Sequence, residues 1–156
     1  MRHARWLLIV LAGTGGAQWR HFGEGDMLAA HNAVRSRVGV APLRWSVRLA
    51  ARAQEWADNL LAHRRFAHRP NSPYGENLFE MMGAAASSAQ VVNAWAEESR
   101  NYDYSSNRCR GMCGHYTQIV WSETREVGCA VARSVGREVW VCNYDPAGNV
   151  VGKRPY

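Results

Sequence analysis

The sequence predicts an α+β fold, in which helices and a small antiparallel sheet share one core. Three segments within the first hundred residues repeat apolar side chains at helical spacing. Two apolar, β-branched runs near the C-terminus flank a short turn, which is the signal of a hairpin. At 156 residues the chain is long enough for one domain with its own core.

The N-terminus has the pattern of an export signal. Residues 1–5 are basic, residues 6–12 form a short apolar run, and residues 13–17 are small, with a cleavage point before Gln18. The apolar run is too short for a transmembrane helix. We therefore predict a signal peptide over 1–17 and a single mature domain over 18–156, the alternative being an apolar tail on a cytosolic protein.

The mature chain opens with two predicted helices. Asp26 is a suitable N-cap for a helix over residues 27–38, which Gly39 ends. Ser46 is a suitable cap for a second helix over residues 47–63. The apolar stripe of this second helix contains Leu49, Ala53, Trp56 and Leu60.

The middle of the chain alternates between short elements. Residues 76–81 fit a short strand, and a third helix opens at Ser87 or Ser88 and ends near Arg100. Residues 101–114 are polar and contain cysteine, so we expect a long loop.

The C-terminal hairpin places two cysteines opposite each other. Its strands are expected over residues 127–133 and 137–144, and opposed residues in an antiparallel pair have position numbers with a constant sum. A tight turn between Val135 and Gly136 then opposes Cys129 to Cys142, within reach of a disulfide.

Four cysteines suit an exported chain with two disulfides, for which the sequence alone permits three pairings. If Cys129 pairs with Cys142, the remaining bridge is Cys109–Cys113, which closes a small loop ahead of His115. The competing interpretation is a zinc site, because Cys109 and Cys113 have metal-like spacing. No second close pair of cysteines accompanies them, so we favour disulfides.

The chain is basic, with a formal net charge of +6 and a pI of about 9.5. One interpretation is attraction to anionic surfaces such as phospholipid, glycan or nucleic acid. The other is a compositional bias toward arginine, which we favour because Lys153 is the only lysine. The basic residues form no dense block, so the sequence does not predict a nucleic-acid partner.

Several motifs occur together in a fixed order. They are His68, Tyr74-Gly75-Glu76-Asn77-Leu78, Trp95-Ala96-Glu97-Glu98, the segment from Gly114 to Trp121 and the segment from Cys142 to Asn149. This set resembles the signatures of the CAP superfamily, which includes cysteine-rich secretory proteins, antigen 5 and plant pathogenesis-related protein 1. The likeness covers about residues 26–156, and residues 152–156 look most like the plant branch. It implies a three-layer α–β–α sandwich.

The resemblance also raises two questions about this chain. Relatives place a short helix at residues 116–121, where local propensity favours a strand because the segment is rich in Thr, Ile, Val and aromatic residues. Plant relatives usually carry a third disulfide, but Arg64 and Ser134 occupy the positions of that bridged pair here.

Members of this family share a cleft lined by two histidines and two glutamates. The matching residues are His68, Glu76, Glu98 and His115. Helical periodicity independently selects Glu98 over its neighbour Glu97, because Glu98 shares a face with Val91, Trp95 and Tyr102. A carboxylate on an apolar face needs a partner, and a histidine is the natural one.

Three interpretations of this tetrad compete. The first is a hydrogen-bonded network that does no chemistry. The second is a site for a divalent cation such as zinc, held by His68 and His115. The third is a hydrolytic centre. Because the ligands come from separated loops, we expect metal occupancy to be conditional and no cofactor to be obligatory. We favour the first two interpretations, since no nucleophile is identifiable and all four cysteines are assigned to bridges.

Tyr102, Tyr104 and Tyr116 surround the predicted disulfide loop, where relatives are thought to bind sterols or fatty acids. We expect these tyrosines to form an apolar lip, although packing is the simpler role for some of them. For His31 we favour core hydrogen bonding over a place in the cleft.

The favoured function is binding of a lipid or sterol-like ligand in defence or interaction with other organisms. The alternatives are a metal-assisted protease and a protein-interaction module. We expect a monomer without an integral membrane segment, secreted or, in a bacterium, periplasmic.

Overall fold

The structure is a computed structural model, and residues 22–156 are described. The signal peptide predicted at residues 1–17 lies outside the described residues. Among the helices of the described part, none has the length and apolar character that a membrane span requires.

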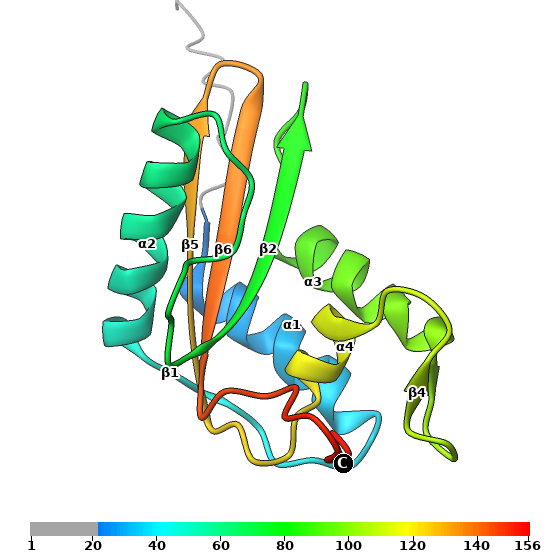
Figure 1. The fold of residues 1–156 in the computed structure, drawn as a ribbon. Coiled ribbons are helices and arrows are strands. Elements are labelled where there is room, and N and C mark those ends of the chain that lie inside the picture. Colours follow the sequence, from blue (N-terminus) through cyan, green and yellow to red (C-terminus); the bar gives the residue numbers. More distant parts are fainter. Residues whose placement is uncertain (1–21) are drawn as a thin grey trace, which may run out of the picture.

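The molecule has three layers, as the resemblance implies (Figure 1). The central sheet runs in the order β1 (Arg44–Trp45), β5 (Glu126–Ser134), β6 (Arg137–Asp145) and β2 (Gly75–Met82). Only the β1–β5 pairing is parallel. Helix α2 (Val47–Ala62) covers one face, and the other layer contains α1 (Glu24–Ser36), α3 (Ser88–Ala96) and α4 (Gly114–Ile119). The α+β class is confirmed.

The two faces of the sheet bury different kinds of side chain. Between α2 and the sheet the buried side chains are small and aliphatic, including Ala53 and Leu60 of α2 and Ala130 and Val139 of the sheet. A Cβ at Gly128 of β5 would lie 2.2 Å from the backbone nitrogen of Ala50, so glycine allows α2 to pack closely on the sheet. The opposite face buries bulkier side chains, among them Trp95, Trp140 and Tyr144.

The first helix begins earlier than predicted. Gly23, and not Asp26, holds the N-cap position of α1, and Asp26 lies in the first helical turn together with Glu24. The prediction of Asp26 as the cap is therefore wrong. Acidic residues are favourable throughout the first turn because they face the positive end of the helix dipole, so the same signal fits more than one starting point.

The second and third helices agree better with the prediction. Ser46 precedes α2 at the N-cap position, although its side chain makes no capping hydrogen bond. Ser87 caps α3 in a reciprocal arrangement with Gln90. The α-helix ends at Ala96, and its predicted continuation is a 3₁₀ turn, η1 (Glu97–Asn101).

The hairpin register is the predicted one. Ser134 pairs with Arg137, and Cys129 pairs with Cys142, with which it forms a disulfide. The second disulfide joins Cys109 to Cys113, so both predicted bridges are confirmed and none of the four cysteines is free. The expected loop before α4 also contains a two-stranded ladder of β3 (Tyr102–Asp103) and β4 (Arg108–Cys109), which the sequence analysis did not anticipate.

Candidate functional site

The first His–Glu pair lies at the start of the edge strand β2. The side chain of Glu76 is almost fully buried, whereas that of His68 is 64% exposed. Oε1 of Glu76 accepts hydrogen bonds from Nδ1 of His68 at 2.8 Å and from the backbone N–H of Arg69 at 3.0 Å. The hydrogen bond to this carboxylate raises the pKa of His68 above its usual value, against the opposing effect of partial burial.

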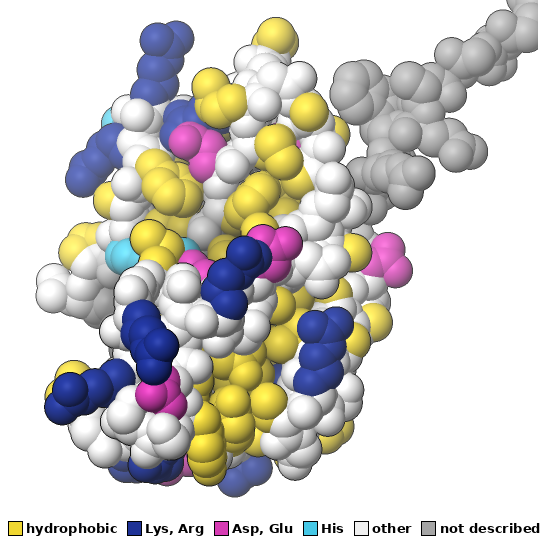
Figure 2. Space-filling model, turned by 90° about the vertical axis from the view of Figure 1, so that its right-hand side faces the viewer, with side chains coloured by type: hydrophobic (Ala, Val, Ile, Leu, Met, Phe, Trp, Pro, Cys, Tyr) yellow, Lys and Arg dark blue, Asp and Glu magenta, His cyan; other side chains and the backbone are white. Residues whose placement is uncertain are grey.

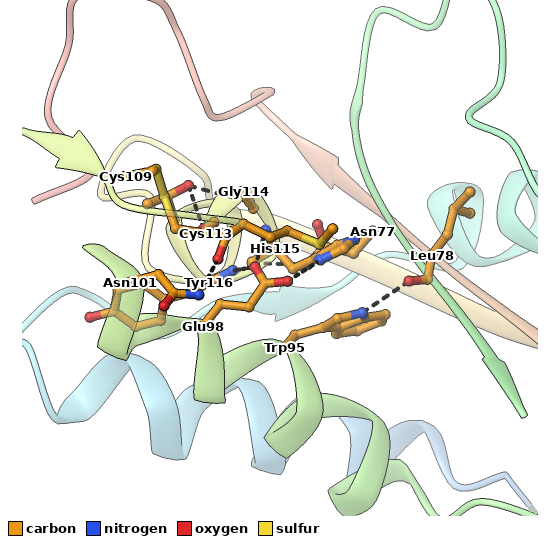
Figure 3. A network of polar contacts seen from close by, with 12 residues as sticks. Asn77, Leu78, Trp95, Glu98, Asn101, Cys109, Cys113, Gly114, His115 and Tyr116 are labelled. Carbon is orange, nitrogen blue, oxygen red and sulfur yellow. Dashed lines mark hydrogen bonds and ion pairs between the residues drawn. A yellow bond between two sulfur atoms is a disulfide. The ribbon is translucent and has the colours of Figure 1, made fainter.

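The second pair joins the 3₁₀ turn η1 to helix α4 (Figure 3). Oε1 of Glu98 lies 2.7 Å from Nδ1 of His115. Oε2 of the same carboxylate accepts the backbone N–H groups of His115 at 3.0 Å and Tyr116 at 3.4 Å. Glu98 therefore satisfies two donors that the first turn of any helix leaves without an intrahelical partner. The neighbouring Glu97 instead pairs with Arg100 at the surface.

These contacts explain why residues 114–119 are helical despite their strand-like composition. Besides Glu98 at its start, α4 is held by the hydroxyl of Thr117, whose single proton has its shortest contact with Oδ1 of Asn149 at 2.6 Å and also lies within reach of the carbonyl oxygens of Cys113 and Gly114. Tertiary hydrogen bonds thus override the local propensity, and the strand reading of this segment is wrong.

Two further side chains hold His115, one at its ring and one at its backbone (Figure 3). The ring of Trp95 stacks on it with centroids 6.1 Å apart, and the Trp95 indole N–H donates to the carbonyl oxygen of Leu78 at 3.0 Å. The amide of Asn77 donates to the backbone carbonyl of His115 at 3.1 Å. His115 is consequently fixed by side chains from α3, η1 and β2.

A buried chain of hydrogen bonds continues from Asn77 into the core. Its amide also donates to the hydroxyl of Tyr144 at 3.1 Å, and that hydroxyl lies 2.9 Å from Nε2 of His31. Nδ1 of His31 lies 2.8 Å from the carbonyl oxygen of Met27. Burial lowers the pKa of His31 to about 4, so this imidazole stays neutral at physiological pH. His31 has the core role that we favoured.

Both His–Glu pairs use the same ring nitrogen. In each pair Nδ1 faces the carboxylate. The other ring nitrogen, Nε2 of His68 and of His115, makes no hydrogen bond with residues 22–156. A carboxylate on Nδ1 is the usual partner of a metal-bound histidine, since it fixes the tautomer that leaves Nε2 unprotonated. Oε2 of Glu76 is buried without a partner in the described part of the chain, a further polar group that suits a cation. Within residues 22–156 the tetrad does not bring three ligand atoms within 4.8 Å of one another, so a metal held there by the two imidazoles would need other ligands, such as water, to complete its coordination.

A second candidate group of metal ligands consists of His31, Cys129 and Cys142, whose ligand atoms lie within 4.8 Å of one another. Metals bind cysteine as the thiolate. Here the two sulfurs form a disulfide and both nitrogens of His31 make hydrogen bonds, so this group offers no ligand in the oxidised protein.

Figure 2 shows the face formed by α3, α4 and the disulfide loop. Histidine atoms lie recessed near its middle, beside acidic and hydrophobic side chains. Within residues 22–156, no serine, threonine or cysteine side chain hydrogen-bonds either tetrad imidazole. The described residues thus offer neither tetrad imidazole the hydroxyl or thiol partner of a nucleophilic triad.

The three tyrosines proposed as a lip gather around a fourth, Tyr156. The ring of Tyr104 stacks on Tyr156 with centroids 4.9 Å apart, Tyr102 lies edge-on to it at 6.4 Å, and the hydroxyl of Tyr116 hydrogen-bonds its hydroxyl at 3.1 Å. Tyr116 is buried and Tyr104 is about half exposed. Next to Tyr102 lies a cavity of about 240 Å³, whose lining includes Thr117, Trp121, Asn149, Val150, Val151 and Pro155.

Comparisons with known proteins agree with this architecture. The model of the CAP family, described as the cysteine-rich secretory protein family, matches residues 28–144. Pathogenesis-related protein 1 of Arabidopsis thaliana is 45% identical over 132 residues, which cover 84% of this chain and 81% of the relative. The basic form of pathogenesis-related protein 1 from Nicotiana tabacum is 46% identical over 136 residues, covering 84% and 74%.

Solved structures with the same fold include venom allergen-like protein 4 of Schistosoma mansoni, with a TM-score of 0.69 and 28% identity over 85% of this chain and 92% of that one. The crystal structure of NaASP2 with Zn2+ has a TM-score of 0.70 and 26% identity, covering 85% and 84%. Fold, disulfides, motif order and the extent of these matches lead to one conclusion: the chain belongs to the CAP family of cysteine-rich secretory proteins.

Proposed function

We propose that this protein is exported and binds a lipid or sterol-like ligand outside the cell, with the His–Glu tetrad serving as a site for a divalent cation. The observation that carries the cation site is the shared geometry of the two pairs, in which each imidazole turns Nδ1 to a glutamate and leaves Nε2 free. We further propose defence, or interaction with other organisms, as the context, because relatives at about 45% identity are pathogenesis-related proteins.

His68 and His115 would hold the cation, and the glutamates would orient them. A cation bound there would act as a Lewis acid toward an oxygen-containing ligand. The chain's own residues fix the two imidazoles unequally: Glu98, Trp95 and the backbone of α4 hold His115, whereas His68 depends on Glu76 alone. The relative crystallised with Zn2+ supports testing this cation first.

The lipid site is proposed at the tyrosine lip and the adjoining cavity. Tyr102 belongs to both, and the cavity lining adds the apolar side chains of Trp121, Val150 and Pro155. Burying aliphatic groups there would stabilise the complex by about 0.8 kcal/mol per CH₂. Tyr104 is the lip residue most accessible to an incoming ligand because its side chain is half exposed.

Export is proposed from two features that agree. The N-terminal residues have the pattern of a signal peptide over 1–17, the mature domain over 18–156 contains two disulfides, and such bridges persist in oxidising compartments. We expect the mature protein to be found outside the cell, or in the periplasm if the source is bacterial.

The function is tested with three forms of the mature protein: wild type, Glu98→Gln and Tyr104→Asp. Each is run through one sterol-uptake assay and one broad hydrolase screen. Uptake should fail only in Tyr104→Asp, because a charged side chain at the lip opposes transfer of apolar surface. None of the three should hydrolyse a substrate. Reproducible turnover that disappears in Glu98→Gln would contradict the proposal and favour a metal-assisted hydrolase, in which the glutamate acts as a base.

A further inference from the structure

One end of the sheet exposes three large apolar side chains. Met82, the last residue of β2, is 64% exposed, Val135 in the β5–β6 turn is fully exposed, and Phe66 in the loop after α2 is 49% exposed. Isolated surface residues of this kind are common, but apolar side chains gathered at one site indicate an interaction surface. Their separation in the sequence hides this grouping until the chain is folded.

Backbone contacts hold the three segments together. Met82 pairs with Arg137 in the β2–β6 ladder, and the N–H of Gly83 donates to the carbonyl oxygen of Gly136 at 2.9 Å. The guanidinium of Arg137 donates to the carbonyl oxygen of Arg65 at 2.9 Å, which ties the loop of Phe66 to the same end. Figure 1 shows the end of β2, the β5–β6 turn and the C-terminal end of α2 at the top of the molecule. We call this surface the sheet tip.

The sheet tip is also cationic. Of its four arginines, Arg133 and Arg137 form ion pairs with Glu138 and Glu80, at 2.7 and 2.6 Å. Arg64 and Arg65 are exposed and form no ion pair with a carboxylate of residues 22–156. Figure 2 shows basic and hydrophobic side chains intermixed at this end. The fold thus assembles a basic cluster that the dispersed arginines of the sequence do not reveal.

We propose that the sheet tip docks the protein on the surface of an anionic lipid bilayer. Exposed apolar side chains at loop tips enter the boundary between headgroups and acyl chains, and the arginines beside them stay at the level of the anionic headgroups. The unpaired Arg64 and Arg65 give the charge complementarity that selects an anionic membrane over a neutral one. This inference concerns side chains outside the tetrad and does not rest on the proposed ligand or cation site.

The mature protein is tested by co-sedimentation with vesicles of phosphatidylcholine alone and with vesicles that also contain phosphatidylserine. The first variant combines Phe66→Ser, Met82→Ser and Val135→Ser, and the second combines Arg64→Gln and Arg65→Gln. The matched control combines Met112→Ser and Val47→Ser, which remove exposed apolar side chains elsewhere, in the disulfide loop and at the start of α2. Far-ultraviolet circular dichroism and thermal melts establish that all three variants are folded.

Wild type should bind only the anionic vesicles, and binding should weaken as salt is added. Each sheet-tip variant should lower the partition coefficient by about tenfold or more, since each arginine near such a surface contributes on the order of a fivefold gain. The control should bind like wild type. The proposal is overturned if wild type does not bind anionic vesicles, if it binds both kinds equally, or if the control loses binding while the sheet-tip variants keep it.

Discussion

The two His–Glu pairs of the tetrad use the same atoms but differ in how firmly they are held. Glu98 and His115 are both largely buried, with side chains 14% and 23% exposed, and the carboxylate also accepts two backbone N–H groups. His68 is 64% exposed, and its one described side-chain hydrogen bond is with Glu76. The tetrad therefore combines one closely held imidazole with one that has few contacts.

This difference has a consequence for function. A site built from two rigid histidines would discriminate strictly between ligand geometries, whereas one adjustable histidine permits uptake and release without deforming the core. We therefore expect the Glu98 pair to contribute to folding stability and, if the tetrad holds a cation as proposed, the His68 pair to contribute mainly to binding. The predictions below test this division.

The largest expected effect is the replacement of Glu98 by alanine. It leaves the ring N–H of His115 and two backbone N–H groups of α4 without their acceptor, which should lower the free energy of unfolding by about 3–4 kcal/mol. Glu76→Ala should cost only about 1–2 kcal/mol, because it also relieves the burial of an unpaired carboxylate oxygen. Urea denaturation measures both.

The neighbouring Glu97→Ala is the matched control for Glu98, because Glu97 is exposed and pairs only with Arg100 at the surface. It should change the free energy of unfolding by less than about 0.5 kcal/mol. Equal costs at Glu98 and Glu76 would remove the distinction between a fixed and an adjustable pair.

The hydrogen-bond chain behind His115 should make stability depend on pH. The pKa of buried His31 is lowered to about 4, so between about pH 6.5 and 4 the unfolded chain binds a proton that the folded protein does not. His31 therefore contributes stability above pH 6.5 that is lost as the pH falls toward 4, amounting to about 3 kcal/mol. Denaturation of wild type and His31→Gln across this range checks the loss, which should be smaller in the variant.

A smaller effect is expected when the hydroxyl between His31 and Asn77 is removed. Tyr144→Phe keeps the ring but deprives two buried nitrogens of their partner, at a cost of about 2 kcal/mol. Because Asn77 also holds the backbone of His115, the NMR signals of His115 should broaden or shift, while those of His68 should not. A shift at His68 alone would contradict the proposed connection.

Within the tetrad, the smallest effect on stability is expected at His68. Its pKa is raised by Glu76, so the stabilisation is fully present below about pH 6.5 and is lost as the pH rises through the higher pKa of the folded protein. Because the side chain is mostly exposed, His68→Ala should change the free energy of unfolding by less than about 1 kcal/mol. An NMR titration of wild type should give a pKa above about 6.5 for His68.

Much of this architecture follows from local sequence patterns. The register of a hairpin is set by its turn, which is a local feature of the sequence. The turn at Val135 and Gly136 places Cys129 opposite Cys142 and so predicts their disulfide. Helical periodicity is also a local feature, and it selected Glu98 over Glu97 as the tetrad carboxylate. The two-residue strand β1 was missed because a segment this short carries no period.

What escaped prediction depends on contacts between distant residues. The helical state of α4 depends on Glu98 and Asn149, which local propensity does not register. The partner of His31 is Tyr144, 113 positions away, and only the fold brings the two rings together. The unequal support of the two tetrad histidines follows from packing around η1 and α3, which local sequence patterns do not reveal.

The most direct test of the account is zinc binding by titration calorimetry at about pH 7.5 and about pH 5.5, since protonated imidazole does not bind metal. Wild type should bind at the higher pH and lose most of its affinity at the lower one. His68→Ala and His115→Ala should each abolish binding, and the control His63→Ala, which alters an exposed histidine outside the tetrad, should retain it. Equal affinity at both pH values, or unchanged binding after His115→Ala, would contradict a cation site built from the two His–Glu pairs.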